Sequence, residues 1–233
     1  MVGSISTGNV DTATHVGVNV PGMNADMFGL DNGVRAAESL YEAAKRIGPG
    51  SMPAIVTWFG YRTPGAAEVV TPFRAQVGAY GLAEFLNGIG AARAGSEAVR
   101  VGLMGHSYGS TTAALALAQT RFRLDSFTTY GSAGLPHGIK RKDLNVKKIF
   151  ATEAEADYWA KTGRFVSGRN DPRDLDGVKD FSAEGGRRED RVTVHDMFTD
   201  GDATEKDGDV GYLSGNTGVV NDLGHILIDG KPR

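Results

Sequence analysis

The most informative part of this 233-residue chain is the stretch Val101-Gly-Leu-Met-Gly105-His-Ser107-Tyr-Gly109-Ser-Thr-Thr-Ala-Ala-Leu-Ala-Leu-Ala. The run 98–104 is apolar apart from Arg100 and has the length of a buried strand. The alanine-rich run after Gly109 has no polar face, which predicts a helix that is buried on all sides. We therefore expect both segments in the core.

The five residues between them, Gly105 to Gly109, match the pattern G-x-S-x-G. A strand that turns at once into a helix holds its middle residue in a strained conformation, and small residues two positions before and after it let the backbones pass closely. The hydroxyl of Ser107 would then be exposed at the carboxyl end of a sheet, near the positive end of a helix. A serine in an ordinary turn is the alternative, and the flanking strand and helix favour the elbow.

The rest of the chain predicts alternating strands and helices. Strands are expected over 15–20, 53–59, 124–130, 146–151 and 191–194, and helices over 30–47, 75–94 and 219–227. This alternation is typical of an α/β fold with a mostly parallel sheet and helices on both faces. Residues 164–190 are expected to form a long polar excursion. We interpret the aromatic residues at the end of one strand as core side chains, with an acyl-pocket lining as the alternative: Trp58, Phe59 and Tyr61.

The amino-acid composition limits the classes of protein to which the chain can belong. With 40% hydrophobic and 23% charged residues and no linker, the chain is expected to form one domain over 1–233, with a polar lead-in at 1–14. A net charge of −3 argues against nucleic acid as a partner. The absence of cysteine excludes disulfides, thiol catalysis and cysteine metal sites.

No apolar run approaches the roughly 18 residues of a membrane span, so no integral membrane segment is expected. The chain does not open on a charged and then apolar leader. Both the cytoplasm and secretion with a leader already removed stay open, as does the oligomeric state.

A serine hydroxyl has too high a pKa to attack an ester unaided and needs a histidine base with a carboxylate to orient it. With an elbow of this kind the chain order is serine, acid, histidine. His15 and His106 precede the serine, and His137 follows it too soon to leave room for a strand and an acid. His225 lies within the C-terminal helix. His195, directly after 191–194, is therefore the expected base, with an exposed loop histidine as the alternative.

Several carboxylates could serve as the acid. Glu153, Glu155 and Asp157 follow the strand 146–151, and Asp171 stands in a later Gly-Arg-Asn-Asp-Pro turn. The residues alone leave this choice open. A backbone donor for an oxyanion is expected where the strand 15–20 ends in Pro21-Gly22-Met23, with a plain turn as the alternative.

No cofactor or metal is expected. Neither a dinucleotide fingerprint nor a phosphate-binding loop follows a strand. The acidic stretch 199–209 fits a calcium loop at Asp200 and Asp202 but departs from it at the glycine and final glutamate positions. Five arginines are interleaved with acidic residues, which indicates a mixed surface: Arg164, Arg169, Arg173, Arg187 and Arg188.

Four motifs together are recognisable: Gly105-His-Ser-Tyr-Gly-Ser-Thr-Thr, Val18-Asn-Val-Pro-Gly, Thr57-Trp-Phe-Gly-Tyr and Val194-His-Asp-Met-Phe. With them, the chain resembles, from about His15 to the C-terminal helix, an actinobacterial and phage α/β-hydrolase family long catalogued as a domain of unknown function. The resemblance implies the α/β-hydrolase fold. It also implies a set of site residues: Ser107 as nucleophile, Asp157 as acid, His195 as base, and the backbone N–H groups of Met23 and Tyr108 as the oxyanion hole. The family pattern usually places Asp-Pro after the acid strand, whereas this chain has Glu-Ala-Asp157-Tyr.

These observations predict a serine hydrolase that cleaves carboxylic esters through an acyl-enzyme on Ser107. Its substrate would be a small-molecule or lipid ester, with short acyl groups because no long apolar lid helix is evident. An acyltransferase with the same triad is one alternative. A catalytically idle hydrolase-fold binding module of a larger secreted or phage protein is the other.

Overall fold

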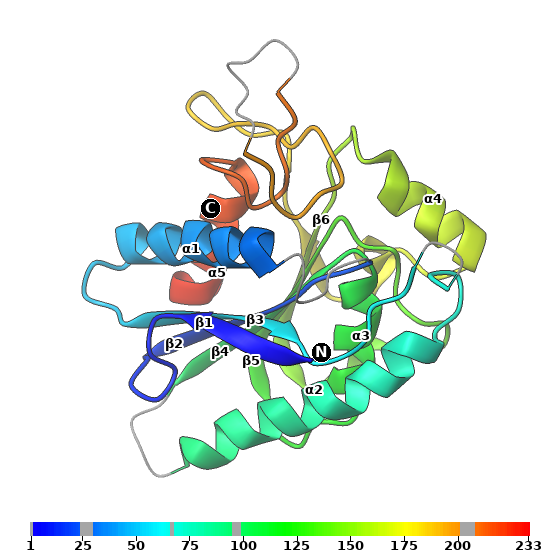
Figure 1. Cartoon of the computed structure of the whole chain (residues 1–233), viewed down its shortest axis with the longest axis horizontal. Coiled ribbons are helices and arrows are strands. Elements are labelled where there is room, and N and C mark those ends of the chain that lie inside the picture. The colour runs from blue at the N-terminus through cyan, green and yellow to red at the C-terminus, as the bar shows by residue number, and fades with distance from the viewer. Residues whose placement is uncertain (1, 24–29, 66–67, 95–98, 201–207) are drawn as a thin grey trace.

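A seven-stranded sheet forms the centre of the protein (Figure 1). The computed structural model describes residues 2–23, 30–65, 68–94, 99–200 and 208–233. The strand order is β1-β3-β2-β4-β5-β6-β7, and every neighbouring pair is parallel except β1 with β3. The strands are β1 Gly3–Thr7, β2 His15–Val20, β3 Pro53–Phe59, β4 Arg100–His106, β5 Leu124–Tyr130, β6 Val146–Thr152 and β7 Val178–Asp180.

Helices cover both faces of this sheet, as the alternating pattern predicts (Figure 1). The helices are α1 Leu30–Ile47, α2 Phe73–Ala92, α3 Tyr108–Leu117, α4 Tyr158–Ser167 and α5 Gly218–Asp229, with short 3-10 turns at Arg141–Asp143 and Pro172–Asp174. Helices α1 and α5 pack together on one face, and α2 and α3 pack together on the other. The apolar side chains between the helices and the sheet form one core on each face.

The strand, turn and helix around Ser107 occupy the middle of the sheet. β4 lies between β2 and β5, and α3 follows it after a single residue. Nine of the ten residues of α3 are buried, which agrees with its lack of a polar face in the sequence. The prediction of two core elements joined by a sharp turn is confirmed.

The expected polar lead-in 1–14 is wrong in part, because residues Gly3–Thr7 form β1. This strand pairs antiparallel with β3 along the edge of the sheet. Its alternate residues are only half-buried, and an edge strand needs backbone hydrogen bonds more than apolar side chains on both faces. The polar sequence therefore hid the strand.

The expected strand at 191–194 is also wrong. Val192 N–H donates to the carbonyl of Ala183, and Thr193 N–H donates to that of Val210, so the segment pairs with loops. The edge of β6 is occupied instead by β7, which lies within the stretch expected to be a polar excursion. That stretch also contains the C-terminal end of α4 and a 3-10 turn.

The three aromatic side chains at the end of β3 belong to the core, as we interpreted them. Trp58, Phe59 and Tyr61 are all buried. Tyr61 Oη donates a hydrogen bond of 3.1 Å to the carbonyl of Pro21, which ties this corner to the end of β2. Among the described residues, no helix has the length and apolar character needed to cross a bilayer.

Candidate active site

Ser107 occupies a strained backbone position at the turn from β4 to α3. Its φ is 51° and its ψ is −125°, and it is the single non-glycine residue with positive φ in the described ranges. Close packing around the turn explains both flanking glycines. A Cβ on Gly105 would lie 2.7 Å from the Cα of Ser110, and one on Gly109 would lie 2.1 Å from the carbonyl oxygen of Val20. The turn therefore holds the serine in a conformation that an ordinary loop would relax.

A continuous hydrogen-bond chain links Ser107 to a histidine and a carboxylate. His195 Nε2 lies 2.9 Å from Ser107 Oγ, and His195 Nδ1 lies 2.9 Å from each oxygen of Asp157. An ionised carboxylate can only accept, so Nδ1 carries the proton and Nε2 is free to accept from the serine hydroxyl. This tautomer is the one in which the ring can take up a proton from Ser107.

Asp157 accepts hydrogen bonds from three donors although it is buried. Besides His195, it accepts from Tyr212 Oη at 2.7 Å and from the Ala160 N–H at 2.9 Å, where it caps the N-terminus of α4. Burial raises the pKa of this carboxyl, but the hydrogen bonds and the charge of His195 outweigh that effect and lower the pKa to about 2. The carboxylate is therefore ionised at neutral pH.

The other candidate acids have different partners. Glu153 and Asp171 both pair with Arg164 and Arg173, at a distance of 3.1 Å between Arg164 Nη2 and Asp171 Oδ2. Glu155 is exposed. The structure thus brings together Ser107, Asp157 and His195, whereas Glu153 and Asp171 lie in a separate ion-pair cluster and Glu155 lies on the surface.

Two residues around the site were not anticipated as part of it. His106 Nε2–H donates to the carbonyl of His195 at 2.8 Å, and its ring lies 5.0 Å from the His195 ring. Burial and the neighbouring His195 lower the pKa of His106 to about 3, which keeps it neutral. Tyr212 is the other, and its Oη also accepts from the Ala154 N–H at 3.0 Å. His106 adjoins the serine in sequence, whereas no sequence signal marks Tyr212.

The end of β2 lies directly against the serine. A Cβ on Gly22 would be 2.6 Å from Ser107 Cβ, so only glycine fits there. Met23 follows and lines the pocket above Ser107. The Tyr108 N–H begins α3, while its side chain is fully buried and donates from Oη to the Thr71 carbonyl at 2.7 Å. The segment after β2 and the first turn of α3 thus both border the serine.

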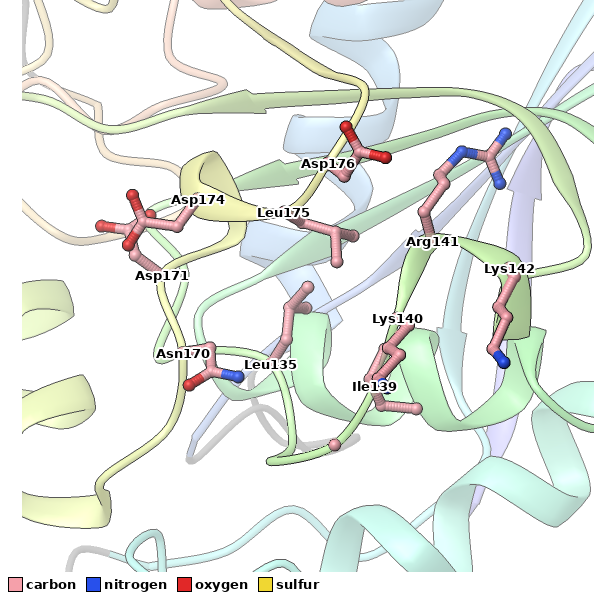
Figure 2. A pocket seen from close by; sticks show the side chains of 11 residues that line it. Leu135, Ile139, Lys140, Arg141, Lys142, Asn170, Asp171, Asp174, Leu175 and Asp176 are labelled. Atoms are coloured by element: carbon pink, nitrogen blue, oxygen red, sulfur yellow. The ribbon is translucent and has the colours of Figure 1, made fainter.

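Ser107 and His195 open into a pocket of about 590 Å³. Its wall is formed by one face of α4, by residues 69 and 70, and by the loop that carries His195. A larger cavity of about 750 Å³ lies elsewhere, between residues 135–142 and 170–176 (Figure 2). Lys140 and Lys142 approach that second cavity from one segment and Asp171 and Asp174 from the other, and the serine is absent from its lining.

The remaining expectations concern groups away from this pocket. His225 pairs with Asp229 on the surface of α5 at 2.7 Å. Asp200 pairs with Arg35, while Asp202 lies outside the described residues. Within the described ranges no cluster of three or more histidine or acidic side chains is arranged to hold a metal ion.

Sequence comparison decides the family. Residues 2–166 match the model of a family described as Alpha/beta hydrolase, and this segment carries β1 to β6, the serine turn and Asp157. The chain belongs to the alpha/beta hydrolase family. His195 lies beyond the matched segment.

Relatives of this alpha/beta hydrolase occur in mycobacteria. It is 32% identical over 171 residues to Rv2079 of Mycobacterium tuberculosis (strain ATCC 25618 / H37Rv), covering 70% of this chain and 26% of that protein. It is 31% identical over 144 residues to Mb0988c of Mycobacterium bovis, covering 58% of this chain and 53% of that protein. Both carry the description uncharacterized. The chain therefore spans about a quarter to a half of the curated relatives it matches.

Among solved structures, the hydrolase resembles one titled esterase PE8. The TM-score is 0.52 at 12% sequence identity, covering 84% of this chain and 92% of that one. At this sequence identity the similarity shows that the two proteins share a fold.

Proposed function

We propose that this hydrolase cleaves carboxylic esters through an acyl-enzyme on Ser107. The observation that carries the proposal is the hydrogen-bond chain from Ser107 through His195 to Asp157, with both links at 2.9 Å. This geometry suits a nucleophile, a general base and an orienting carboxylate. It also argues against an idle binding module, which has no need of a strained serine aligned with a histidine of the right tautomer.

In the first half of the reaction, Ser107 Oγ attacks the ester carbonyl while His195 Nε2 takes its proton. Asp157 stabilises the imidazolium that forms and keeps the ring oriented. The backbone N–H groups of Met23 and Tyr108 bind the oxyanion, each contributing about 3 kcal/mol. His195 then protonates the departing alcohol, and the acyl group stays on the serine.

In the second half, water replaces the alcohol beside His195. The imidazole takes a proton from the water, hydroxide attacks the acyl carbonyl, and the same backbone donors bind the second oxyanion. Collapse of this intermediate releases the acid and returns the proton to Ser107. The cycle needs no cofactor.

Covalent labelling with a fluorophosphonate tests this proposal. We expect the wild-type protein to be labelled at Ser107, the Ser107→Ala variant to stay unlabelled, and the His195→Ala variant to be labelled at a greatly reduced rate. On p-nitrophenyl butyrate, kcat of the Ser107→Ala variant should fall by at least about 10⁴-fold. Circular dichroism checks that each variant is folded.

The chain offers a matched control in His225 and Asp229, a histidine–carboxylate pair at 2.7 Å in which the histidine is half-buried and the carboxylate exposed. His225→Ala and Asp229→Asn should label and turn over like the wild type, whereas Asp157→Asn should lose activity. A folded wild-type protein that neither labels nor hydrolyses any ester would contradict the proposal and favour a binding role.

A further inference from the structure

One face of α4 supplies five of the fifteen residues that line the pocket above Ser107. Five residues of this helix line it at helical spacings of one, three and four: Tyr158, Trp159, Thr162, Gly163 and Val166. The opposite side of the helix is anchored to the protein. Ala160 is buried, and Arg164 Nη1 donates to the carbonyl of Ser132 at 2.7 Å. The pocket-facing side of α4 is thus held in place above the serine.

Large apolar side chains of this face are exposed to solvent. Trp159 is 64% exposed and Val166 is 59% exposed. In the described part of the chain, eleven large apolar side chains are exposed, and five of them line this one pocket: Met23, Val70, Tyr158, Trp159 and Val166. Covering exposed apolar surface in a concave site with an apolar ligand removes that surface from water, which favours binding of the ligand.

Charge in the pocket excludes another class of ligand. Among the described residues of its lining, none is lysine or arginine, and the one acidic side chain is the exposed carboxylate of Asp196. A substrate with an anionic acyl group would find no cation to pair with and one carboxylate to repel it. The nearby Arg164 and Arg173 are paired with Glu153 and Asp171.

We infer that the pocket binds a large, uncharged, apolar acyl group along α4, so the substrates are esters of apolar acids of medium chain length or with an aromatic ring. The inference rests on the proposed ester hydrolysis. It differs from the short-chain preference that the absence of a long lid helix predicts, because α4 is a short helix that supplies the apolar wall.

The position of His195 decides which part of the ester occupies this wall. His195 Nε2 must give its proton to the departing alcohol, so the alcohol lies beside the His195 loop, where Thr193 and Asp196 also line the pocket. The acyl group therefore binds on the opposite, apolar side of the pocket, which is formed by α4 and residues 69–70.

The test is a series of p-nitrophenyl esters from acetate to octanoate, held below the concentration at which they aggregate. We expect kcat/KM for octanoate to exceed that for acetate by about tenfold or more, since each apolar contact in a pocket adds discrimination of this order. In Trp159→Ala and Val166→Ala the octanoate-to-acetate ratio should fall about five- to tenfold. The matched control is Phe165→Ala, because Phe165 is on α4 and 89% exposed but absent from the lining.

A cation introduced into the pocket provides a second readout, because it should favour esters of anionic acids. Val166→Lys should raise the ratio of mono-p-nitrophenyl adipate to p-nitrophenyl hexanoate turnover by about tenfold, because it places a cation where the wild-type wall has none. Loss of folding cannot produce such a gain.

The outcomes separate the two proposals. If Ser107 is labelled but the acetate and octanoate esters are turned over equally, the apolar-acyl inference is overturned and ester hydrolysis stands. The same conclusion follows if the octanoate-to-acetate ratio is unchanged in Trp159→Ala and the adipate-to-hexanoate ratio is unchanged in Val166→Lys. Absence of labelling would overturn ester hydrolysis and, with it, the inference.

Discussion

The backbone strain at Ser107 has a measurable energetic consequence. At φ 51° and ψ −125° a side chain is disfavoured by about 1–3 kcal/mol, while glycine tolerates the conformation at an entropic cost of about 0.5–1 kcal/mol. The protein retains serine there, which we attribute to the proposed role of its hydroxyl.

We therefore expect Ser107→Gly to be more stable than Ser107→Ala by about 1 kcal/mol, or roughly 2–4 °C in Tm. Both variants lack the hydroxyl and should be inactive, so the comparison isolates the backbone term. Differential scanning calorimetry of the two proteins checks it. Equal melting temperatures would show that the turn relaxes around alanine.

The hydroxyl of Tyr212 orients Asp157, and its removal should reduce kcat with little effect on KM. In Tyr212→Phe the carboxylate loses the 2.7 Å donor and the buried Ala154 N–H loses its acceptor. We expect kcat to fall about tenfold and stability to fall by about 1–3 kcal/mol.

Tyr130→Phe serves as the control, because Tyr130 is equally buried and its ring lies 5.5 Å from that of Tyr212, but its hydroxyl donates to Asn19 Oδ1 at 2.7 Å. It should lose stability without a comparable loss of kcat. If both variants lost kcat equally, the Tyr212 hydroxyl would have only a structural role.

Within helices, glycines that look alike in sequence differ in what surrounds them. In α2, a Cβ on Gly88 would meet nothing within 4 Å, whereas one on Gly78 would lie 2.7 Å from the ring of Tyr61. The first glycine only lowers helix propensity, while the second allows α2 to approach the buried Tyr61.

Gly88→Ala should therefore stabilise the protein by about 0.5–1 kcal/mol, and Gly78→Ala should destabilise it by about 1–3 kcal/mol through overpacking. Urea unfolding of both variants measures the difference. Shifts of the same sign would mean that propensity rather than packing governs this helix.

The stability of the protein in acid should depend strongly on His106. Burial and the adjacent His195 lower its pKa to about 3, compared with about 6.5 in the unfolded chain. The unfolded state then binds the extra proton as the pH falls below about 6.5, so stability is lost between about pH 6.5 and pH 3, at up to roughly 1.4 kcal/mol per pH unit.

Between pH 7 and pH 5 we expect this histidine to contribute about 2 kcal/mol of the loss in unfolding free energy. His106→Phe should lose about that much less over the same interval, although it starts less stable at pH 7 because the His195 carbonyl loses its donor. Denaturant unfolding at both pH values tests this, with His225→Gln, at a half-buried histidine on α5, as control. Parallel pH dependences in wild type and His106→Phe would refute it.

The linear pattern of residues predicted the layered α/β fold and the serine turn. Hydrophobic periodicity and the two glycines around Ser107 are local features. Each depends on the backbone conformation of only a few consecutive residues, so it can be recognised in the sequence. Chain order pointed to His195 by excluding the other histidines, although the strand expected before it, 191–194, pairs with loops.

Contacts between distant segments decided the rest. Glu153, Glu155, Asp157 and Asp171 are equivalent as a list of carboxylates, and only the folded chain commits two of them to arginines and places Asp157 against His195. Three further features were decided by tertiary contacts: the edge strand β1, the loop pairing of 191–194 and the apolar wall of α4. Each depends on which backbone or surface is left unpartnered once the other elements have packed, and that is a property of tertiary structure.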